Sequence, residues 1–231
     1  MGAVIAHQLK AYMKKVLVNV SIIVGMLLLY FVPSVLMGLS MLSASKHVGE
    51  SFVWFRDLAP LLGMLIASIG LLYWAHTLGW FENLNWRIGG KGWLHLIVVF
   101  VLMQVWVMAF SEFKPEHTDN DKAIMELMDL FPLWLMFVFI CIAAPICEEV
   151  IFRGAIIGQA FAKHLWWGAA VSTLLFAAIH MPEDAISWLM YGGLGAAFSW
   201  VYVRTKQLWQ CVVLHMANNL LALASMLGWL G

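Results

Sequence analysis

Two adjacent carboxylates and an arginine interrupt an apolar stretch of this sequence. Glu148, Glu149 and Arg153 follow the run 131–147, which contains no charged residue. A charged side chain at bilayer depth costs about 2.5–3.5 kcal/mol on insertion scales, so it indicates a partner or a function. On a helix, Glu149 and Arg153 share one face, where the guanidinium can neutralise the carboxylate. Glu148 lies about 100° further round the helix and lacks that partner. A structural ion pair therefore accounts for Glu149 and Arg153 but not for Glu148.

Two further polar pairs lie in apolar runs downstream. Phe176 and His180 have an FxxxH spacing, and His215 and Asn219 have an HxxxN spacing that puts both on one helix face. A single buried histidine is more often structural than catalytic. However, Glu148 and His180 are each sixteen residues from a predicted turn at residue 164, which places them at one depth in a helical hairpin. We therefore expect one polar pocket that contains Glu148, His180, His215 and Asn219.

These residue types suit the hydrolysis of an amide. A carboxylate beside an imidazole in a poorly solvated pocket is typical of a general base. A second pair of donors, here His215 and Asn219, can stabilise an oxyanion. Cys147 precedes Glu148 but points elsewhere on the helix, and no serine or cysteine is placed as an obvious nucleophile.

The composition is that of an integral membrane protein. The chain of 231 residues is 63% hydrophobic and 11% charged, whereas soluble domains have about 25% charged residues. Thirteen basic and thirteen acidic residues give zero net charge, which offers no electrostatic basis for binding nucleic acid. The three cysteines lie in apolar runs and do not indicate a disulfide framework.

The periodicity predicts an all-α, polytopic membrane bundle of about seven transmembrane helices, after a short interfacial helix in residues 1–15. The expected spans are about 16–42, 58–80, 93–110, 131–148, 165–180, 186–203 and 208–229. Pro33 allows a kink in the first span, and the fourth span can continue past Pro145 to about residue 163. A short helix is expected to start near Lys122 in the polar segment 111–130. We divide the chain into residues 1–130, with spans one to three and the polar loop, and a catalytic core in residues 131–231.

The distribution of basic residues predicts a multi-pass protein of the cell membrane with a cytoplasmic N-terminus. Nine basic residues then lie on the cytoplasmic side: Lys10, Lys14, Lys15, Arg87, Lys91, Arg153, Lys163, Arg204 and Lys206. Four lie on the outer side: Lys46, Arg56, Lys114 and Lys122. With this orientation we expect the polar pocket in the cytoplasmic half of the membrane, open to cytoplasmic water.

The three signatures EExxxR, FxxxH and HxxxN, in this order on separate predicted membrane helices, resemble the CPBP family of intramembrane proteases. That family includes the type II CAAX prenyl endopeptidases and bacterial proteins of bacteriocin processing and immunity. The resemblance covers about residues 131–222 and leaves the first 130 residues without a specific signal.

The resemblance implies a CAAX-type intramembrane endopeptidase with a glutamate mechanism. Glu148 would activate a water molecule with His180, while Glu149 would pair with Arg153 and Phe176 would support the site. His215 and Asn219 would form the oxyanion hole. The substrate would be a membrane-associated peptide or protein. A metal-free mechanism is favoured, because the sequence has no HExxH motif and Asn219 is a poor zinc ligand. The alternative is a zinc ion held by Glu148, His180 and His215.

Two other functions fit parts of the pattern. A transporter could use a buried Glu and His proton relay, but its polar residues would be spread along a pathway across several helices. Here they cluster on the fourth, fifth and seventh predicted spans. A non-catalytic immunity or scaffold protein could keep the fold while binding a peptide without cleaving it. Cleavage of membrane-anchored peptides by the purified protein separates these alternatives.

Overall fold

A computed structural model describes residues 2–44, 50–113 and 117–230, and all regular structure in these ranges is helical. In the first half, the helices are α1 (Gly2–Tyr30), α2 (Val32–Ala44), α3 (Glu50–Thr77), α4 (Gly90–Ser111) and α5 (Asp119–Leu130). In the second half, one continuous helix consists of α6 (Leu133–Phe137), η1 (Val138–Ala143), α7 (Ala144–Glu149) and η2 (Val150–Ala160). It is followed by α8 (Leu165–Ile179), α9 (Ala185–Thr205) and α10 (Leu208–Met226). The predicted all-α membrane bundle is confirmed.

Within the described ranges, six helical segments are long and apolar enough to cross a membrane, whereas seven spans were expected. They are 7–42, 56–77, 90–111, 133–160, 185–205 and 208–226. The expected fifth span is α8, an apolar helix of 15 residues, which is shorter than the 20 or so residues that a hydrocarbon core requires. On α3, the exposed residues Leu62, Ile66, Ile69 and Tyr73 recur every three or four positions. This stripe is the face that lipid would cover.

Two predicted boundaries differ from the structure. No separate helix occupies residues 1–15, because α1 runs unbroken from Gly2 to Tyr30 and the sequence has no proline or turn signal near residue 15. The helix of the polar segment begins at Asp119 rather than near Lys122. Thr118 caps it, accepting a hydrogen bond from the Asp121 amide, while the Asp121 carboxylate accepts one from the Thr118 amide.

A break between two helices lies next to Pro33, where the sequence allowed a kink. Proline lacks an N–H group, so it cannot continue the hydrogen-bond ladder of a helix. The chain turns at Phe31, between the end of α1 at Tyr30 and the start of α2 at Val32. By contrast, Pro145 does not end its helix, which continues from Leu133 to Ala160.

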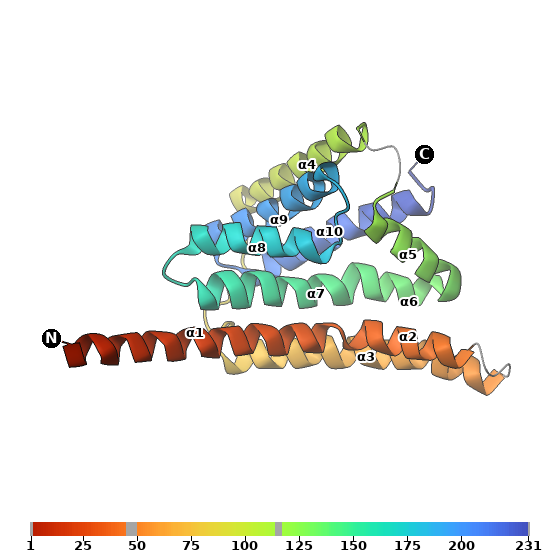
Figure 1. The fold of residues 1–231 in the computed structure, drawn as a ribbon. Helices are drawn as coiled ribbons and strands as arrows, with labels where there is room; N and C mark the ends of the chain where they lie inside the picture. The colour runs from red at the N-terminus through yellow and green to blue at the C-terminus, as the bar shows by residue number, and fades with distance from the viewer. Residues whose placement is uncertain (1, 45–49, 114–116, 231) are drawn as a thin grey trace.

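The helix 133–160 lies at the centre of the bundle. Figure 1 shows α1, α2 and α3 along one side of it and α8, α9 and α10 on the other. It is also the most enclosed of the candidate spans, with 67% of its most apolar window buried. A short loop at 161–164 returns the chain into α8, at the end of the bundle away from α5. Side chains on the central helix can therefore meet groups from both layers.

Candidate active site

The central helix carries both carboxylates in the short α-helical segment α7 and the arginine in the wide turn that follows it. Its backbone forms π-helical turns over Val138–Ala143 and Val150–Ala160, on either side of α7. Such turns are rare and occur mostly at functional sites. Glu148, Glu149 and Arg153 are all buried, and Arg153 and Glu149 are completely enclosed. Ion pairs or hydrogen bonds from neighbouring helices must therefore compensate these charges.

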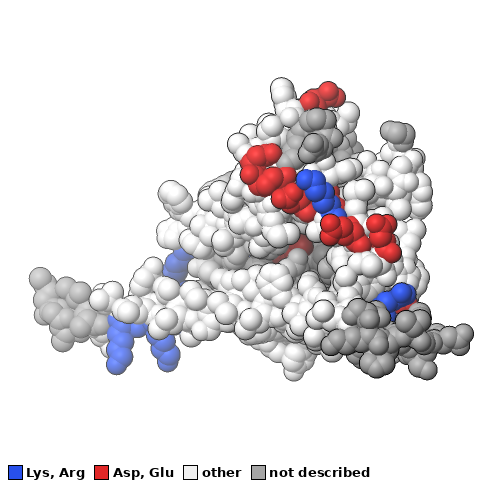
Figure 2. Space-filling model, turned by 45° about the vertical axis from the view of Figure 1, so that its right-hand side comes forward, with Lys and Arg blue, Asp and Glu red and all other residues white. Residues whose placement is uncertain are grey.

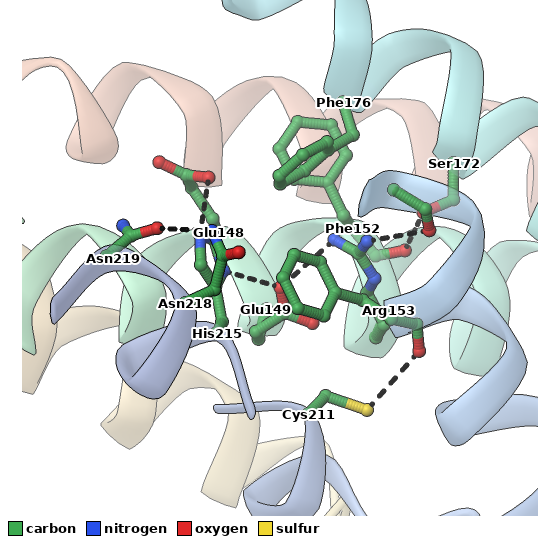
Figure 3. A network of polar contacts seen from close by, with 12 residues as sticks. Glu148, Glu149, Phe152, Arg153, Ser172, Phe176, Cys211, His215, Asn218 and Asn219 are labelled. Carbon is green, nitrogen blue, oxygen red and sulfur yellow. Dashed lines mark hydrogen bonds and ion pairs between the residues drawn. The ribbon is translucent and has the colours of Figure 1, made fainter. Parts of the chain in front are cut away.

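Glu149 is held from two directions by basic groups. Arg153 Nη1 lies 3.2 Å from Glu149 Oε1, the i,i+4 ion pair that the sequence spacing suggests. His215 Nδ1 on α10 lies 2.9 Å from the same oxygen (Figure 3). Because Glu149 accepts at this nitrogen, Nδ1 carries the hydrogen and Nε2 is the ring atom left to face the pocket. Glu149 thus fixes the orientation of His215.

Aromatic rings enclose the guanidinium of Arg153. Its carbon Cζ lies 4.8 Å from the ring centroid of Phe176 and 5.2 Å from that of Phe198. Arg153 Nη2 also donates to the carbonyl of Gly195 on α9, at 3.0 Å. Cation–π contacts strengthen where water is excluded. Phe176, expected to support the site, contacts the arginine and also lies 5.7 Å from the His215 ring centroid.

Glu148 has one oxygen engaged and one without a hydrogen-bond partner. Tyr30 on α1 donates its hydroxyl to Glu148 Oε1, at 2.9 Å. Glu148 Oε2 is buried and has no hydrogen-bond partner among the residues described. His215 Nε2 lies 3.9 Å from Oε2. This separation is too long for a direct hydrogen bond but leaves both atoms free to bind a shared third molecule.

His180 borders this pair without bonding to Glu148. It caps the C-terminus of α8, and its Nδ1 lies 2.7 Å from the carbonyl oxygen of Phe176. Its ring stacks on Tyr191 of α9, with centroids 4.5 Å apart. Glu148 and His215 are close enough to interact with it electrostatically. The structure therefore brings Glu148 and His215 into one contact, and it places His180 beside them.

The acidic helix α5 lies next to His180. The Tyr191 hydroxyl is 2.7 Å from that of Thr118, the N-cap of α5, and Asp121 interacts electrostatically with His180. Figure 2 shows acidic side chains gathered in a row over a hollow in the surface, and α5 contributes Asp119, Asp121, Glu126 and Asp129. His180 thus lies at the end of α8 remote from the 161–164 loop. The sequence predicted a pocket open to cytoplasmic water, and with a cytoplasmic N-terminus the 161–164 loop would lie on that side. The position of His180 does not support this prediction.

Asn219 donates a hydrogen bond to a carbonyl of the central helix that Pro145 leaves without a backbone donor. The Ala144 amide donates to Phe139 in the π-helical turn, and the next residue, Pro145, has no N–H group. In the same i to i−5 pattern, the Ile140 carbonyl would accept from residue 145, which has no N–H group. Asn219 Nδ2 donates to it, at 2.9 Å. One N–H of Asn219 is engaged in this way.

A chain of amides extends from Asn219 to α4. Asn218 Nδ2 donates to Asn219 Oδ1 at 3.3 Å, and Gln104 Nε2 of α4 donates to Asn218 Oδ1 at 3.1 Å. These contacts orient Asn219 from the side opposite to the central helix. A helix of the first 130 residues therefore supports a motif residue.

The candidate zinc ligands do not form a metal site in this arrangement. Within the described ranges, no three His, Cys, Asp or Glu side chains are grouped in a way that could hold a metal ion. Each imidazole uses Nδ1 elsewhere, His180 at the Phe176 carbonyl and His215 at Glu149, so Nε2 of each ring is the nitrogen left for other contacts. Glu148, His180 and His215 are not grouped closely enough in the described structure to share a zinc ion.

Several residues of the site were not predicted from the sequence. Gln104 and Asn218 are amides in apolar runs, a signal of the same kind as the one that identified Asn219. Tyr30 gave no signal, because a tyrosine in a membrane helix is common near an interface. Gly195 contributes only its carbonyl and its lack of a side chain: a Cβ there would lie 3.1 Å from Phe176 Cδ1 and 3.3 Å from the Thr173 carbonyl.

Comparisons with known proteins agree with these motifs. Residues 130–221 match the model of the family described as "Type II CAAX prenyl endopeptidase Rce1-like". The resemblance to the CPBP proteases is thereby confirmed over this segment, which contains every motif residue from Glu148 to Asn219. Tyr30 and Gln104 lie outside it.

Relatives from three bacteria show similarity of different extents. A protein of Bacillus subtilis named membrane peptidase YdiL is 31% identical over 104 residues, 45% of this chain and 41% of that protein. The membrane-embedded CAAX protease MroQ of Staphylococcus aureus is 31% identical over 107 residues, 43% of this chain and 42% of MroQ. The UPF0177 protein YbdI of Lactococcus lactis is 27% identical over 180 residues, 73% of this chain and 94% of YbdI. The alignments with YdiL and MroQ therefore span less than half of either relative. No solved structure matches the chain.

Proposed function

We propose that this chain is an intramembrane endopeptidase that hydrolyses peptide bonds of membrane-associated peptides or proteins. One observation carries the proposal: the buried Glu148 Oε2 faces His215 Nε2 at 3.9 Å and has no hydrogen-bond partner among the described residues. Glu149 Oε2 also lacks such a partner, but the other oxygen of Glu149 is held by two basic groups. A desolvated carboxylate oxygen without a partner costs free energy, and active sites are where proteins retain such groups. The family match over residues 130–221 supports the same reaction class.

In this mechanism Glu148 takes one proton from a water molecule, assisted by the neighbouring His180. The resulting hydroxide adds to the carbonyl carbon of the substrate, and the electron pair of the C=O bond moves to the oxygen. His215 can act on this oxyanion only as the imidazolium, with a second hydrogen on Nε2, because Nδ1 donates to Glu149. In that form, Nε2–H and the free N–H of Asn219 stabilise the oxyanion. The carbonyl then reforms, the C–N bond breaks, and the proton held by Glu148 passes to the leaving amine. Glu149 and Arg153 touch no substrate atom and hold His215 in place.

The proposal also covers the location of the protein, its orientation in the membrane and the extent of its catalytic core. The protein would lie in the cell membrane, with its N-terminus in the cytoplasm as the basic residues indicate. The end of the bundle that carries α5 would then face outward and border the pocket. Residues 131–231 would form the catalytic core, supported by Tyr30 and Gln104 from residues 1–130.

Reconstituted protein provides the test. Purified chain in proteoliposomes is incubated in ¹⁸O-labelled water with a panel of single-span peptides that differ in their juxtamembrane sequence. The expected result is cleavage of some peptides near one end of the span, with one ¹⁸O atom in each new carboxylate. Glu148→Ala should release no product. Absence of cleavage by the parent protein across the panel, with proton flux through the same vesicles, would support a transporter instead.

A further inference from the structure

Tyr30 is the one residue of the first two helices that reaches the candidate site through a described hydrogen bond. It occupies the last position of α1, directly before the turn at Phe31 that Pro33 imposes. Its hydroxyl lies 2.9 Å from Glu148 Oε1, although 118 residues separate the two in the chain. The kink therefore ends α1 at the depth of the carboxylate pair.

The contact gives the two oxygens of Glu148 different surroundings: Oε1 accepts from Tyr30, and Oε2 has no hydrogen-bond partner among the described residues. The other groups near this carboxylate come from several elements: Cys147 and Glu149 on its own helix, His180 at the end of α8 and His215 on α10. None of them makes a hydrogen bond with Glu148 among the described contacts. A hydroxyl that donates to a carboxylate makes a charge-assisted hydrogen bond, and this one, at 2.9 Å, holds Oε1. With Oε1 held by Tyr30, Oε2 is directed toward His215 Nε2.

We propose that Tyr30 is a positioning residue for Glu148: its hydroxyl holds one oxygen so that the other faces the water and the substrate carbonyl. This inference rests on the proposed proteolytic function. Tyr30 touches neither substrate nor water in this role and acts only through the carboxylate.

The packing of Tyr30 can be separated from its hydroxyl. The ring makes an edge contact with Phe31, with centroids 5.1 Å apart, and packs beside the apolar core that includes Met26 and Phe152. A Tyr30→Phe substitution keeps this ring and removes only the donor. Tyr12, on the same helix and 67% exposed, provides the matched control as Tyr12→Phe.

The test compares steady-state kinetics of the two variants in proteoliposomes on a peptide that the parent protein cleaves. For Tyr30→Phe we expect kcat to fall about 10–100-fold, because a small displacement of a reacting group has effects of this size. KM should stay within about twofold of the parent value, since no substrate contact is lost. The melting temperature should fall by no more than the few degrees that one lost hydrogen bond to a buried group costs. Tyr12→Phe should retain parental kcat, KM and melting temperature.

Several outcomes would overturn the proposal. An unchanged kcat in Tyr30→Phe would show that the hydroxyl does not orient Glu148. A large rise in KM would assign Tyr30 to substrate binding, and a larger fall in melting temperature with proportional loss of active protein would assign it to stability. A parent protein that cleaves no peptide contradicts the proposed function, which is a different result from an active parent with an unaffected Tyr30→Phe variant.

Discussion

Glu148 and Glu149 are adjacent in the chain, yet their surroundings differ on the two sides of the central helix. Glu149 faces Arg153 and the ring of His215, and the aromatic rings of Phe176 and Phe198 cover that arginine. Glu148 faces α1, where Tyr30 holds one oxygen, and its second oxygen has no hydrogen-bond partner in the described part of the chain.

The difference follows from helix geometry. A step of about 100° between neighbours directs two like charges to different helices. One carboxylate then pairs through Oε1 with Arg153 and His215, although its Oε2 also lacks a hydrogen-bond partner among the described residues. The other is held by the Tyr30 hydroxyl alone. A buried ion pair contributes little net stability compared with apolar packing, but removing one partner is costly. We therefore expect substitutions on the Glu149 side to act mainly on folding, and those on the Glu148 side mainly on turnover.

The largest expected effect on stability is that of Arg153→Ala. It leaves Glu149 buried without its cation and should destabilise the protein by about 3–5 kcal/mol. Thermal unfolding in detergent and the yield of folded protein measure this loss. Arg204→Ala is the control, because Arg204 is exposed and contacts only the face of Trp200 among its described partners. Parental stability together with lost activity in Arg153→Ala would indicate that the arginine binds substrate instead.

A smaller effect is expected where α9 approaches the arginine. In Gly195→Ala the new methyl group would meet Phe176 Cδ1 at 3.1 Å and the Thr173 carbonyl at 3.3 Å. Gly192→Ala, three residues earlier on the same helix, meets no atom within 4 Å. Both gain the same helix propensity, so Gly195→Ala should be about 1–2 kcal/mol less stable than Gly192→Ala because of overpacking. Equal melting temperatures would mean that Phe176 moves freely and does not clamp Arg153.

Pro145→Ala tests whether the Ile140 contact positions Asn219. We expect stability to stay equal or rise and turnover to fall. An amide at position 145 can bond within the helix and compete with Asn219 for the Ile140 carbonyl. Stability should stay equal or rise by less than about 1 kcal/mol, since a proline is removed from a helix interior. Turnover should fall about 10-fold, because one oxyanion donor becomes mobile. A variant with parental kcat would show that the Ile140 contact does not position Asn219.

Metal removal should have no effect. Glu148, His180 and His215 do not form a ligand group, so chelators should leave peptide cleavage unchanged. Elemental analysis of the purified protein should give far less than one zinc per chain. One zinc per chain that is lost together with activity in His180→Ala would support the alternative metal mechanism.

The sequence predicted most of the helices and the motif residues, for identifiable physical reasons. Charged and amide groups in apolar runs are costly, so Glu148, His215 and Asn219 stood out without a structure. The i,i+4 spacing of Glu149 and Arg153 was sufficient to suggest their pairing. What could not be predicted depends on contacts between distant helices. The hydrogen bond from Tyr30 joins residues 118 positions apart, and the bond between His215 and Glu149 depends on how α10 packs against the central helix.

Backbone detail was equally hidden from the sequence. Pro145 is expected to weaken or break a helix, but the wide turns before it accommodate the missing N–H group and offer the Ile140 carbonyl to Asn219. These features arise from tertiary packing.

The most direct test of the account replaces each glutamate by its neutral isostere and measures kcat and melting temperature side by side. For Glu148→Gln we expect kcat to fall about 10²–10⁴-fold, the range of a general base. Its melting temperature should stay within about 2 °C of the parent, which is under 1 kcal/mol for a chain of this size. For Glu149→Gln we expect a marked fall in melting temperature, because Arg153 loses its counter-charge. Retained turnover in Glu148→Gln, or indistinguishable losses of kcat and stability in both variants, would contradict the separate roles assigned to the two carboxylates.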